Sequence, residues 1–401
     1  MQSQIEFSKK LDLELKNILD YWQNNSIDCE FGGFVGRIDH HNKVDKEYPK
    51  SIVLNTRILW TFSKANNFYK DRRYNQECQR AFDYLFQNFK DKKNGGVYWE
   101  VDYLGKPSNK RKQIYAQAFC IYALSEYHKY SKNPKAILWA MELFQLVEDK
   151  AHDRELNGYI EAFDETWKPI EDVRLSKKDL NAPKTTNTHL HILEAYTALF
   201  EITADIEVEK SLKKLLALFL GRIFAYNYHL KLFFSKDWKT LSTEISYGHD
   251  IEAAWLLVHA AQTTGDVPLI LQTEKLLISV VETFASEALD TDFGVWNSKD
   301  HTTLEMDKDK HWWPQAEAMV GLVYAWKITK NRSYFNICLQ VWDFIETHII
   351  DHENGEWFFR VNPEGIPSTV ENKIGPWKCP YHNGRALMEI LSILDNSQVR
   401  I

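Results

Sequence analysis

The sequence predicts an all-α protein, an (α/α)6 barrel with twelve helices in two rings and short β-hairpins between successive helix pairs. The first observation is a repeat of glycine-containing segments: Gly33 to Gly96 spans 63 residues and Gly96 to Gly158 spans 62. Gly294 to Gly355 spans 61. The second is that each interval holds two helical stretches, of which one is amphipathic and the other is apolar nearly all round. A helix that is apolar on every face is buried, so the units pair an outer helix with an inner one.

The N-terminal segment predicts the first outer helix. Leu11, Leu15, Ile18, Leu19 and Trp22 lie at i, i+4, i+7, i+8 and i+11, with lysines and acids between them, which is typical of an amphipathic helix. The segment FGGFVGRIDHHNKV that follows combines glycines with aromatic and β-branched residues and predicts a short hairpin.

Similar hairpin segments recur along the chain. They start at Gly95, Asn157, His229, Asp292 and Asn354. The segment at His229 lacks the glycine, but it lies near the middle of the 136 residues between Gly158 and Gly294, so that gap holds two units. The total is six units.

The remaining helices are expected between these hairpins. We predict them at 50–70, 72–90, 111–131, 133–150, 184–203, 206–226, 243–264, 267–287, 311–330, 332–349 and 376–396. Outer members such as DRRYNQECQRAFDYLFQNFK carry charges on one face, whereas inner ones include IEAAWLLVHAA and AEAMVGLVYAW. An open solenoid of helical hairpins is the competing architecture, but TPR-like and HEAT-like repeats have shorter periods and no strands.

Length and composition are those of a globular protein. The 401 residues would suggest two or three domains by length alone, but the repeat predicts a single catalytic domain over residues 1–401. Hydrophobic residues make up 44% and charged residues 26%, so there is enough apolar material for a large core. The formal net charge is −7 without a basic tract, which indicates neither a nucleic acid nor a membrane as partner.

Further composition features bear on location and partners. The N-terminus has charges in every turn and no apolar stretch of signal-peptide length, so we expect a cytoplasmic protein. Five cysteines form no CxxC pair, which argues against a disulfide framework or a cysteine zinc site. We expect a monomer that binds a small molecule.

Polar exceptions stand near the starts of the inner helices. They are Arg57, Tyr115, Gln117, Asn187, His191, His249, Glu252, Trp312, Trp313, Glu317 and His382. A single histidine on a helix is more often a surface or hydrogen-bonded core residue than a catalyst, and an aromatic is usually packing. Surface exposure or packing explains less well why polar residues recur at equivalent places in several units. Because the inner helices should run in the same direction, we expect these residues to share one site.

Spacing separates the candidate histidines. His249 and Glu252 are i, i+3 on one helical face. Asn187 and His191 share a face, whereas His189 lies about 200° from His191 on a helical wheel. We therefore predict His191, and not His189, as a site residue. Helix N-termini favour neutral imidazole and stabilise a nearby anion, which suits general-base work.

Other chemistries have less support in the sequence. GxxxxGK[ST], GxGxxG after a strand and HExxH are all missing, so nucleotide and zincin sites have no motif. His189 and His191 could be metal ligands, but partners at a familiar spacing are missing, and we expect no metal. Hydrolysis of glycosides by two carboxylates stays open, and so does a non-catalytic barrel that stacks sugars on Trp312, Trp313 and Trp377.

At these residues the sequence resembles the N-acylglucosamine 2-epimerase superfamily, and within it the cellobiose 2-epimerases. The resemblance covers nearly the whole chain through NTRILW, NTHLHILEAYTALF, SYGHDIEAAWLL, HWWPQAEAMVG and GPWKCPYHNGRALMEI. It implies an (α/α)6 barrel and cofactor-independent, reversible epimerisation at C2 of the reducing-end glucose of a β-1,4-linked disaccharide, through a cis-enediolate. Mannose 2-epimerases and aldose-ketose isomerases share the barrel, so a monosaccharide substrate is the alternative.

The resemblance also implies roles for residues. His249 and His382 would be the acid/base pair, with Arg57 and His191 near the enediolate. The expected sugar contacts or their supports are Tyr115, Asn187, Glu252, Trp312, Trp313, Glu317 and Trp377. Trp377 precedes His382 by five residues in a stretch punctuated by glycine and proline, so we expect its indole at the cavity mouth over a second sugar ring.

Overall fold

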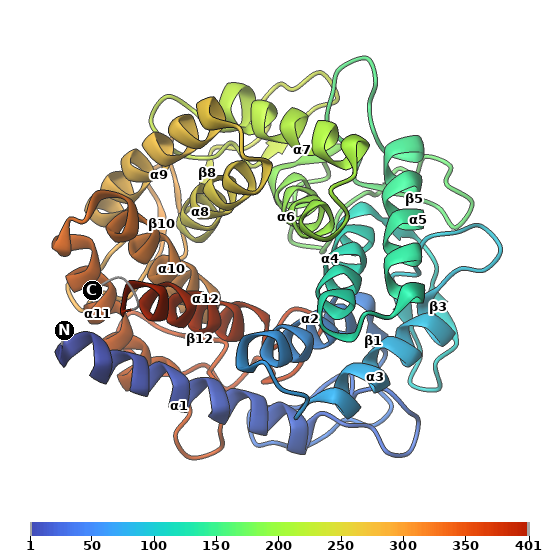
Figure 1. Ribbon diagram of the computed structural model, residues 1–401, viewed down its shortest axis with the longest axis horizontal. Coiled ribbons are helices and arrows are strands. Elements are labelled where there is room, and N and C mark those ends of the chain that lie inside the picture. The colour runs from blue at the N-terminus through green and yellow to red at the C-terminus, as the bar shows by residue number, and fades with distance from the viewer. Residues whose placement is uncertain (1, 399–401) are drawn as a thin grey trace.

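The computed structural model describes residues 2–398 and contains two concentric rings of helices (Figure 1). The outer ring is α1 (Gln2–Asn25), α3 (Asn75–Tyr84), α5 (Pro134–Lys150), α7 (Ile206–Leu218), α9 (Val267–Glu287) and α11 (Arg332–Phe344). The inner ring is α2 (Ile52–Tyr69), α4 (Ile114–Ser131), α6 (Thr186–Thr203), α8 (Tyr247–Thr264), α10 (Trp312–Thr329) and α12 (Tyr381–Gln398). Because α12 packs against both α10 and α2, the inner ring closes. The predicted (α/α)6 barrel is confirmed, and the open solenoid is wrong.

Three outer helices end in a π-helical turn. These turns are η1 (Leu85–Phe89), η2 (Phe219–Ile223) and η3 (Ile345–Ile349), which follow α3, α7 and α11. The sequence analysis predicted each helix and its turn as one continuous helix. Each π-turn is five residues long, which is too short to show in a hydrophobic pattern that is read over several turns.

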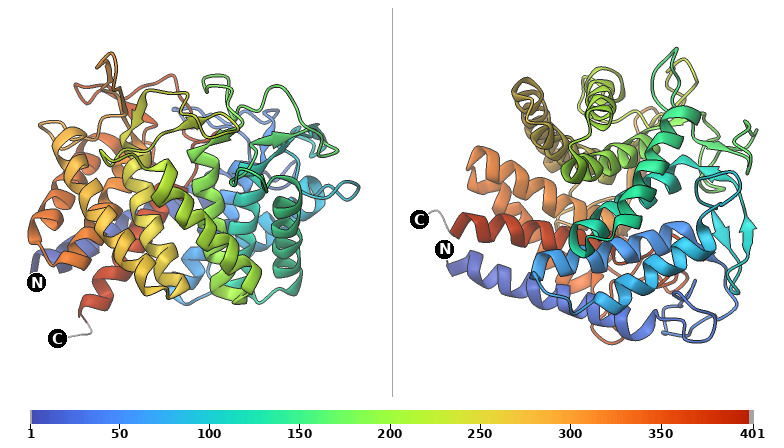
Figure 2. Two further views of the ribbon diagram at one scale, coloured as in Figure 1. Left: turned by 90° about the horizontal axis from the view of Figure 1, so that it is seen from above. Right: turned by 45° about the vertical axis from the view of Figure 1, so that its right-hand side comes forward.

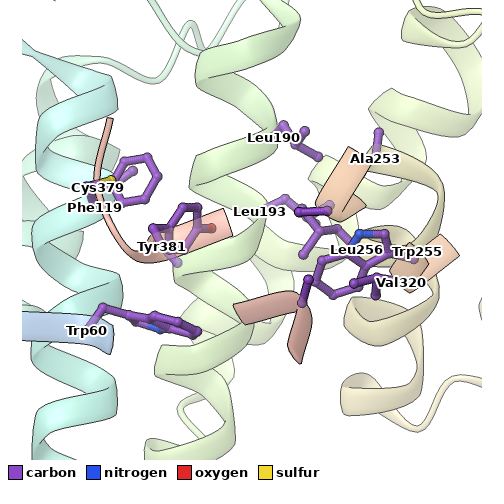
Figure 3. Packing of buried hydrophobic residues seen from close by; sticks show 14 of the residues in the cluster. Trp60, Phe119, Leu190, Leu193, Ala253, Trp255, Leu256, Val320, Cys379 and Tyr381 are labelled. Atoms are coloured by element: carbon purple, nitrogen blue, oxygen red, sulfur yellow. The ribbon is translucent and has the colours of Figure 1, made fainter. Parts of the chain in front are cut away.

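The core lies where the inner helices meet. Tyr381 of α12 packs against Trp60 of α2 and Phe119 of α4, and Leu193 of α6 and Trp255 of α8 belong to the same core cluster (Figure 3). Each of these side chains is at most 2% exposed. Burial of a large apolar side chain stabilises the fold by roughly 1.5–3 kcal/mol, which explains why the inner helices are apolar on every face.

Short strands gather at one end of the barrel, where the inner helices begin (Figure 2, left). A strand before each of five inner helices pairs antiparallel with the hairpin of the next unit. The pairs are β1 (Lys50–Ser51) with β2 (Glu100–Val101), β4 (Lys112–Gln113) with β5 (Ala162–Phe163), β6 (Lys184–Thr185) with β7 (Phe233–Phe234), β8 (Glu244–Ser246) with β9 (Ser298–Asp300), and β11 (Lys310–His311) with β12 (Arg360–Val361). β3 (Pro107–Asn109) joins β2, and β10 (Met306–Asp307) joins β9.

This pairing corrects the predicted helix starts. The segments expected as helix from residues 50, 111, 184, 243 and 311 all have strand residues near their start, so these five inner helices start later than predicted. The last helix starts at Tyr381 and not at residue 376, because prolines at 376 and 380 disfavour the helical conformation in the residues before them. The hairpins were expected to be local, but their strands also connect neighbouring units.

A buried ion pair recurs where a hairpin meets the next strand. Lys50 contacts Asp28 at 2.7 Å, and Lys112 contacts Asp91 at 2.7 Å. The same pairing is made by Lys184 with Asp153, Lys310 with Asp290, and Lys373 with Asp351. In the fourth unit Ile245 stands at the position of the lysine, and a different contact ties the hairpin to the inner helix: His229 Nδ1 lies 2.7 Å from Asp250, the fourth residue of α8. These contacts fix the hairpins over the inner ring. None of the helices described is long and apolar enough to cross a membrane.

Candidate active site

The N-terminal ends of the inner helices surround a cavity of about 200 Å³. It is lined by Arg57, Tyr115, Asn187, His191, His249, Glu252, Trp312, Trp313, Phe359, Trp377 and His382. Ten of the eleven predicted site residues are therefore brought together, and the eleventh, Glu317, lies behind His382 and bonds to it. Phe359 was not predicted, because it lies in a hairpin and not on an inner helix.

His382 is oriented by a carboxylate. Its Nδ1 lies 2.7 Å from Glu317 Oε1 and 3.9 Å from Glu252 Oε1. An ionised carboxylate can only accept a hydrogen bond, so Nδ1 carries the proton and Nε2 is the nitrogen that can take one from a ligand. Burial lowers the pKa of His382 well below its usual value, so the ring is neutral near pH 7.

His191 of α6 has a similar arrangement on the opposite side of the inner ring from α12. Its Nδ1 lies 3.1 Å from Glu194 Oε2, and its ring contacts those of Tyr115 and Phe119 at centroid distances of 4.9 and 4.6 Å. Burial lowers the pKa of His191, and Glu194 opposes this effect. It therefore presents a neutral imidazole to the cavity.

His249 has no carboxylate partner. Its Nδ1 lies 2.7 Å from Ser246 Oγ, and burial lowers its pKa to about 4. The Trp313 ring lies 4.8 Å from the His249 ring and 5.6 Å from the His382 ring, so the indole stands between the two histidines. Gly248 permits this approach, because a Cβ at that position would lie 2.4 Å from the indole.

Arg385 connects the carboxylates behind the cavity. Its guanidinium donates to Glu252 at 2.6 Å, to Glu317 at 2.7 Å, and to Glu194. Burial alone would raise the pKa of Glu194, but Arg385 and His191 outweigh it and lower that pKa to about 2. The sequence analysis did not single out Arg385, although it follows His382 by three residues and so lies on the same helical face.

Arg57 is held among aromatic rings. It donates to the Tyr115 hydroxyl at 2.8 Å and lies over the Phe119 and Tyr381 rings at 4.3 and 4.7 Å. Within the described residues, Arg57 Nε and Asn187 Oδ1 are buried without a hydrogen-bond partner. A buried polar atom without a partner is costly, so both atoms are suited to bind hydroxyl groups of a ligand.

The side chains of two polar residues near the helix starts, His189 and Gln117, contact the hairpins and do not line the cavity. His189 Nε2 accepts the backbone N–H of Tyr159 at 2.8 Å, and Gln117 Oε1 accepts that of Val97 at 2.8 Å. Both side chains tie a hairpin to its inner helix. The preference for His191 over His189 agrees with this geometry, whereas the inclusion of Gln117 among the cavity residues was wrong.

A second cavity of about 210 Å³ adjoins the first. The two share Asn187, His249 and Trp313 as lining residues. The second is also bordered by charged and polar side chains: Glu161, Arg174, Asp179, Glu244 and Asn297. Together the cavities offer room for a ligand longer than one sugar ring.

Metal ligation is a weak interpretation of this site. Glu252, Glu317 and His382 place one ligand atom each within 4.8 Å of one another. Arg385 Nη2 already donates to an oxygen of both carboxylates, and Glu317 also accepts from His382 Nδ1. A guanidinium therefore occupies the place where a cation would be bound.

The helical double ring and its cavity histidines agree with the similarity of this chain to a known protein family. Residues 32–386 match the family described as N-acylglucosamine 2-epimerase (GlcNAc 2-epimerase). The chain therefore belongs to that family.

Individual relatives cover almost the whole chain. The cellobiose 2-epimerase of Bacteroides fragilis is 42% identical over 375 residues, which are 93% of this chain and 95% of the relative. That of Dictyoglomus turgidum is 35% identical over 376 residues, again 93% and 95%. The solved structure of cellobiose 2-epimerase from Spirochaeta thermophila superposes with a TM-score of 0.93 at 37% identity and covers 99% of both chains.

Proposed function

We propose that this protein is a carbohydrate epimerase that reversibly inverts C2 of the reducing-end glucose in β-1,4-linked disaccharides such as cellobiose. The observation that carries the proposal is the pair His249 and His382, two neutral imidazoles on either side of Trp313 in one cavity. Cellobiose 2-epimerases that are 35–42% identical match over more than nine tenths of the chain, whereas a D-mannose isomerase that covers 96% of the chain is 23% identical.

Inversion at C2 needs two proton carriers. After the sugar ring opens, one base removes the C2 proton, and a second group returns a proton on the opposite face. We assign these roles to His249 and His382; the assignment is supported by their positions on different inner helices, α8 and α12, both lining the cavity. The C2–H bond electrons enter the enediolate, and the proton moves to an imidazole Nε2.

The enediolate needs stabilisation of its negative charge. Arg57 supplies a fixed cation. His191 lies in the same part of the cavity, because Tyr115 contacts both Arg57 and His191. Preorganised charges in a buried site stabilise a developing anion without reorganisation. Return of the proton to C1 instead of C2 would give a ketose, so proton placement decides the product.

The proposal also covers the domain organisation, the oligomeric state, the location and the cofactor requirement of the protein. We propose that residues 1–401 form a single catalytic domain, which the contacts of α12 with α1 and α2 support. We also propose that it acts as a monomer in the cytoplasm, without a metal or cofactor, because histidines from one chain supply the proton transfers. The cysteines described are unpaired, which agrees with a reducing compartment.

A disaccharide substrate is supported by two features of the site. The second cavity continues from the first at His249 and Asn187. The half-buried Trp377 stands at the first cavity with its ring 5.9 Å from Tyr115 and 6.1 Å from Trp99. An indole in this position can cover the apolar face of a second ring.

The substrate class is tested with Trp377→Ala and two sugars, cellobiose and mannose. If Trp377 covers the second ring, the variant loses roughly 1–3 kcal/mol in kcat/KM for cellobiose, the scale of burying a large side chain, and any activity on mannose stays nearly unchanged. Equal losses on both sugars, or a wild-type protein that prefers mannose, would favour a mannose 2-epimerase.

A further inference from the structure

The serine before α8 differs from the two other hydroxyl residues that stand directly before inner helices. Ser51 before α2 and Thr185 before α6 cap their helices: their hydroxyls accept the backbone N–H of Leu54 at 3.1 Å and of Thr188 at 3.2 Å. Ser246 occupies the same position before α8 but makes no side-chain cap. A cap of this kind contributes about 0.5–2 kcal/mol, so α8 forgoes a stabilising contact.

The Ser246 hydroxyl contacts His249 instead. Its Oγ lies 2.7 Å from Nδ1, and this is the hydrogen bond that the His249 side chain makes among the residues described. Ser246 is 7% exposed, at the edge of the second cavity. Because Ser246 is the N-cap and His249 the third residue of α8, both lie in the first turn of the helix, and the contact restricts the orientation of the ring.

The partner of His249 differs in kind from those of the other two site histidines. His191 and His382 each face a glutamate through Nδ1. An ionised carboxylate fixes the Nδ1–H tautomer and also stabilises the imidazolium. A hydroxyl adds no charge, and it can either accept from Nδ1–H or donate to Nδ1. The two proton carriers of the proposed reaction therefore have unequal partners.

We propose that Ser246 is a positioning residue, which accepts a hydrogen bond from Nδ1–H of His249 and so keeps Nε2 free to exchange a proton with C2. This inference rests on the proposed function, because the orientation of His249 matters only if His249 exchanges a proton with the sugar. The lost helix cap is the structural cost of that use.

The kinetic test compares Ser246→Ala with the matched control Ser51→Ala. Without the hydroxyl, His249 rotates and divides between tautomers, so we expect kcat for cellobiose epimerisation to fall about 10- to 100-fold, the scale typical of such supporting contacts, with KM nearly unchanged. Ser246→Thr keeps a hydroxyl and should recover most of the activity. A rise in KM with unchanged kcat would overturn the inference, because Ser246 would then be a sugar contact.

The control separates positioning from folding. Ser51→Ala removes a cap and should lower Tm with little change in kcat, whereas Ser246→Ala removes no cap and should leave Tm nearly unchanged. If Ser246→Ala lowers Tm as much as Ser51→Ala and keeps its kcat, Ser246 is structural and the inference is wrong.

A spectroscopic measurement needs no turnover. With 15N-labelled histidine, the imidazole shifts of His249, assigned by the His249→Asn spectrum, should indicate the Nδ1–H tautomer in the wild type and a mixture in Ser246→Ala. A wild-type Nε2–H tautomer would contradict the inference even if epimerisation is observed. Conversely, the expected tautomer without epimerisation would contradict the proposed function alone.

Discussion

At the scale of single residues, the group that faces Nδ1 distinguishes the histidines. His382 and His191 face glutamates, His249 faces a serine, and His189 bonds to backbone at both nitrogens. The first three line the cavity and His189 does not. Helical spacing in the sequence separated His189 from His191, and it puts Glu194 on the same face as His191. It could not supply the partners of His249 and His382, because Ser246 precedes α8 and Glu317 lies on α10.

The acid/base assignment is tested by His249→Asn and His382→Asn. Each change removes one proton carrier, so each should lower epimerisation by about 100-fold or more, while circular dichroism and Tm show a folded barrel. A variant with one remaining base can still exchange the C2 proton without inversion. Near-native turnover in either variant would mean that the two-histidine assignment is wrong.

The role of Arg57 is tested by Arg57→Lys. Lysine keeps the charge but loses the planar fork that contacts two oxygens at once. Since the enediolate exists only along the reaction path, the loss should appear mainly in kcat, measured by steady-state kinetics on cellobiose. An effect confined to KM would assign Arg57 to binding of the ground-state sugar.

At the scale of elements, the fourth residue of several inner helices ties a hairpin to the barrel. Gln117 of α4 and Gln315 of α10 accept the N–H of Val97 and Val295, as His189 of α6 does with Tyr159. These residues look like site candidates in sequence because they are polar within apolar helices. Only their direction in the fold shows that they bond to the hairpins.

This equivalence predicts the behaviour of two changes at His189. His189→Ala leaves the buried N–H of Tyr159 without an acceptor and should lower the free energy of unfolding by about 1–3 kcal/mol. His189→Gln reproduces the contact made by Gln117 and should cost much less. Urea denaturation measures both, and equal destabilisation by the two changes would show that the side-chain amide does not substitute for the imidazole.

Strand pairing between units could not be predicted from the sequence. Two-residue strands such as Lys50–Ser51 and Glu100–Val101 are too short for a period-two pattern. The helices were predictable because their patterns run over several turns. Their polar exceptions, such as Arg57 and His382, stood out for the same reason, whereas Arg385 was not singled out.

At the scale of the whole molecule, the repeated Lys–Asp pairs hold the hairpin layer over the inner ring. Lys50 and Asp28 are buried, whereas Lys46 and Glu30 form an exposed pair in the same hairpin at 2.9 Å. Burial alone would raise the pKa of Asp28, but Lys50 and two backbone N–H groups lower it. The buried pair should therefore matter more for stability than the exposed one.

The prediction compares Asp28→Asn with Glu30→Gln. Asp28→Asn leaves a buried lysine unpaired and should cost about 3–5 kcal/mol in unfolding free energy at pH 7, whereas Glu30→Gln should cost less than about 1 kcal/mol. Because the folded pKa of Asp28 is below its unfolded value of about 3.9, this stabilisation is present above that pH and is lost as the pH falls further. The difference between wild type and Asp28→Asn should thus shrink in acid, and a difference independent of pH would contradict the ion-pair account.

The central claim, epimerisation at C2 through proton exchange with two histidines, is tested most directly by incubating the protein with cellobiose in D2O and following the sugar by NMR and mass spectrometry. We predict a glucosyl-mannose product with deuterium at C2 and an intact glycosidic bond. Released glucose would indicate a hydrolase, and cellobiose recovered unlabelled and unchanged would indicate a barrel that binds sugar without catalysis; either result would contradict the account.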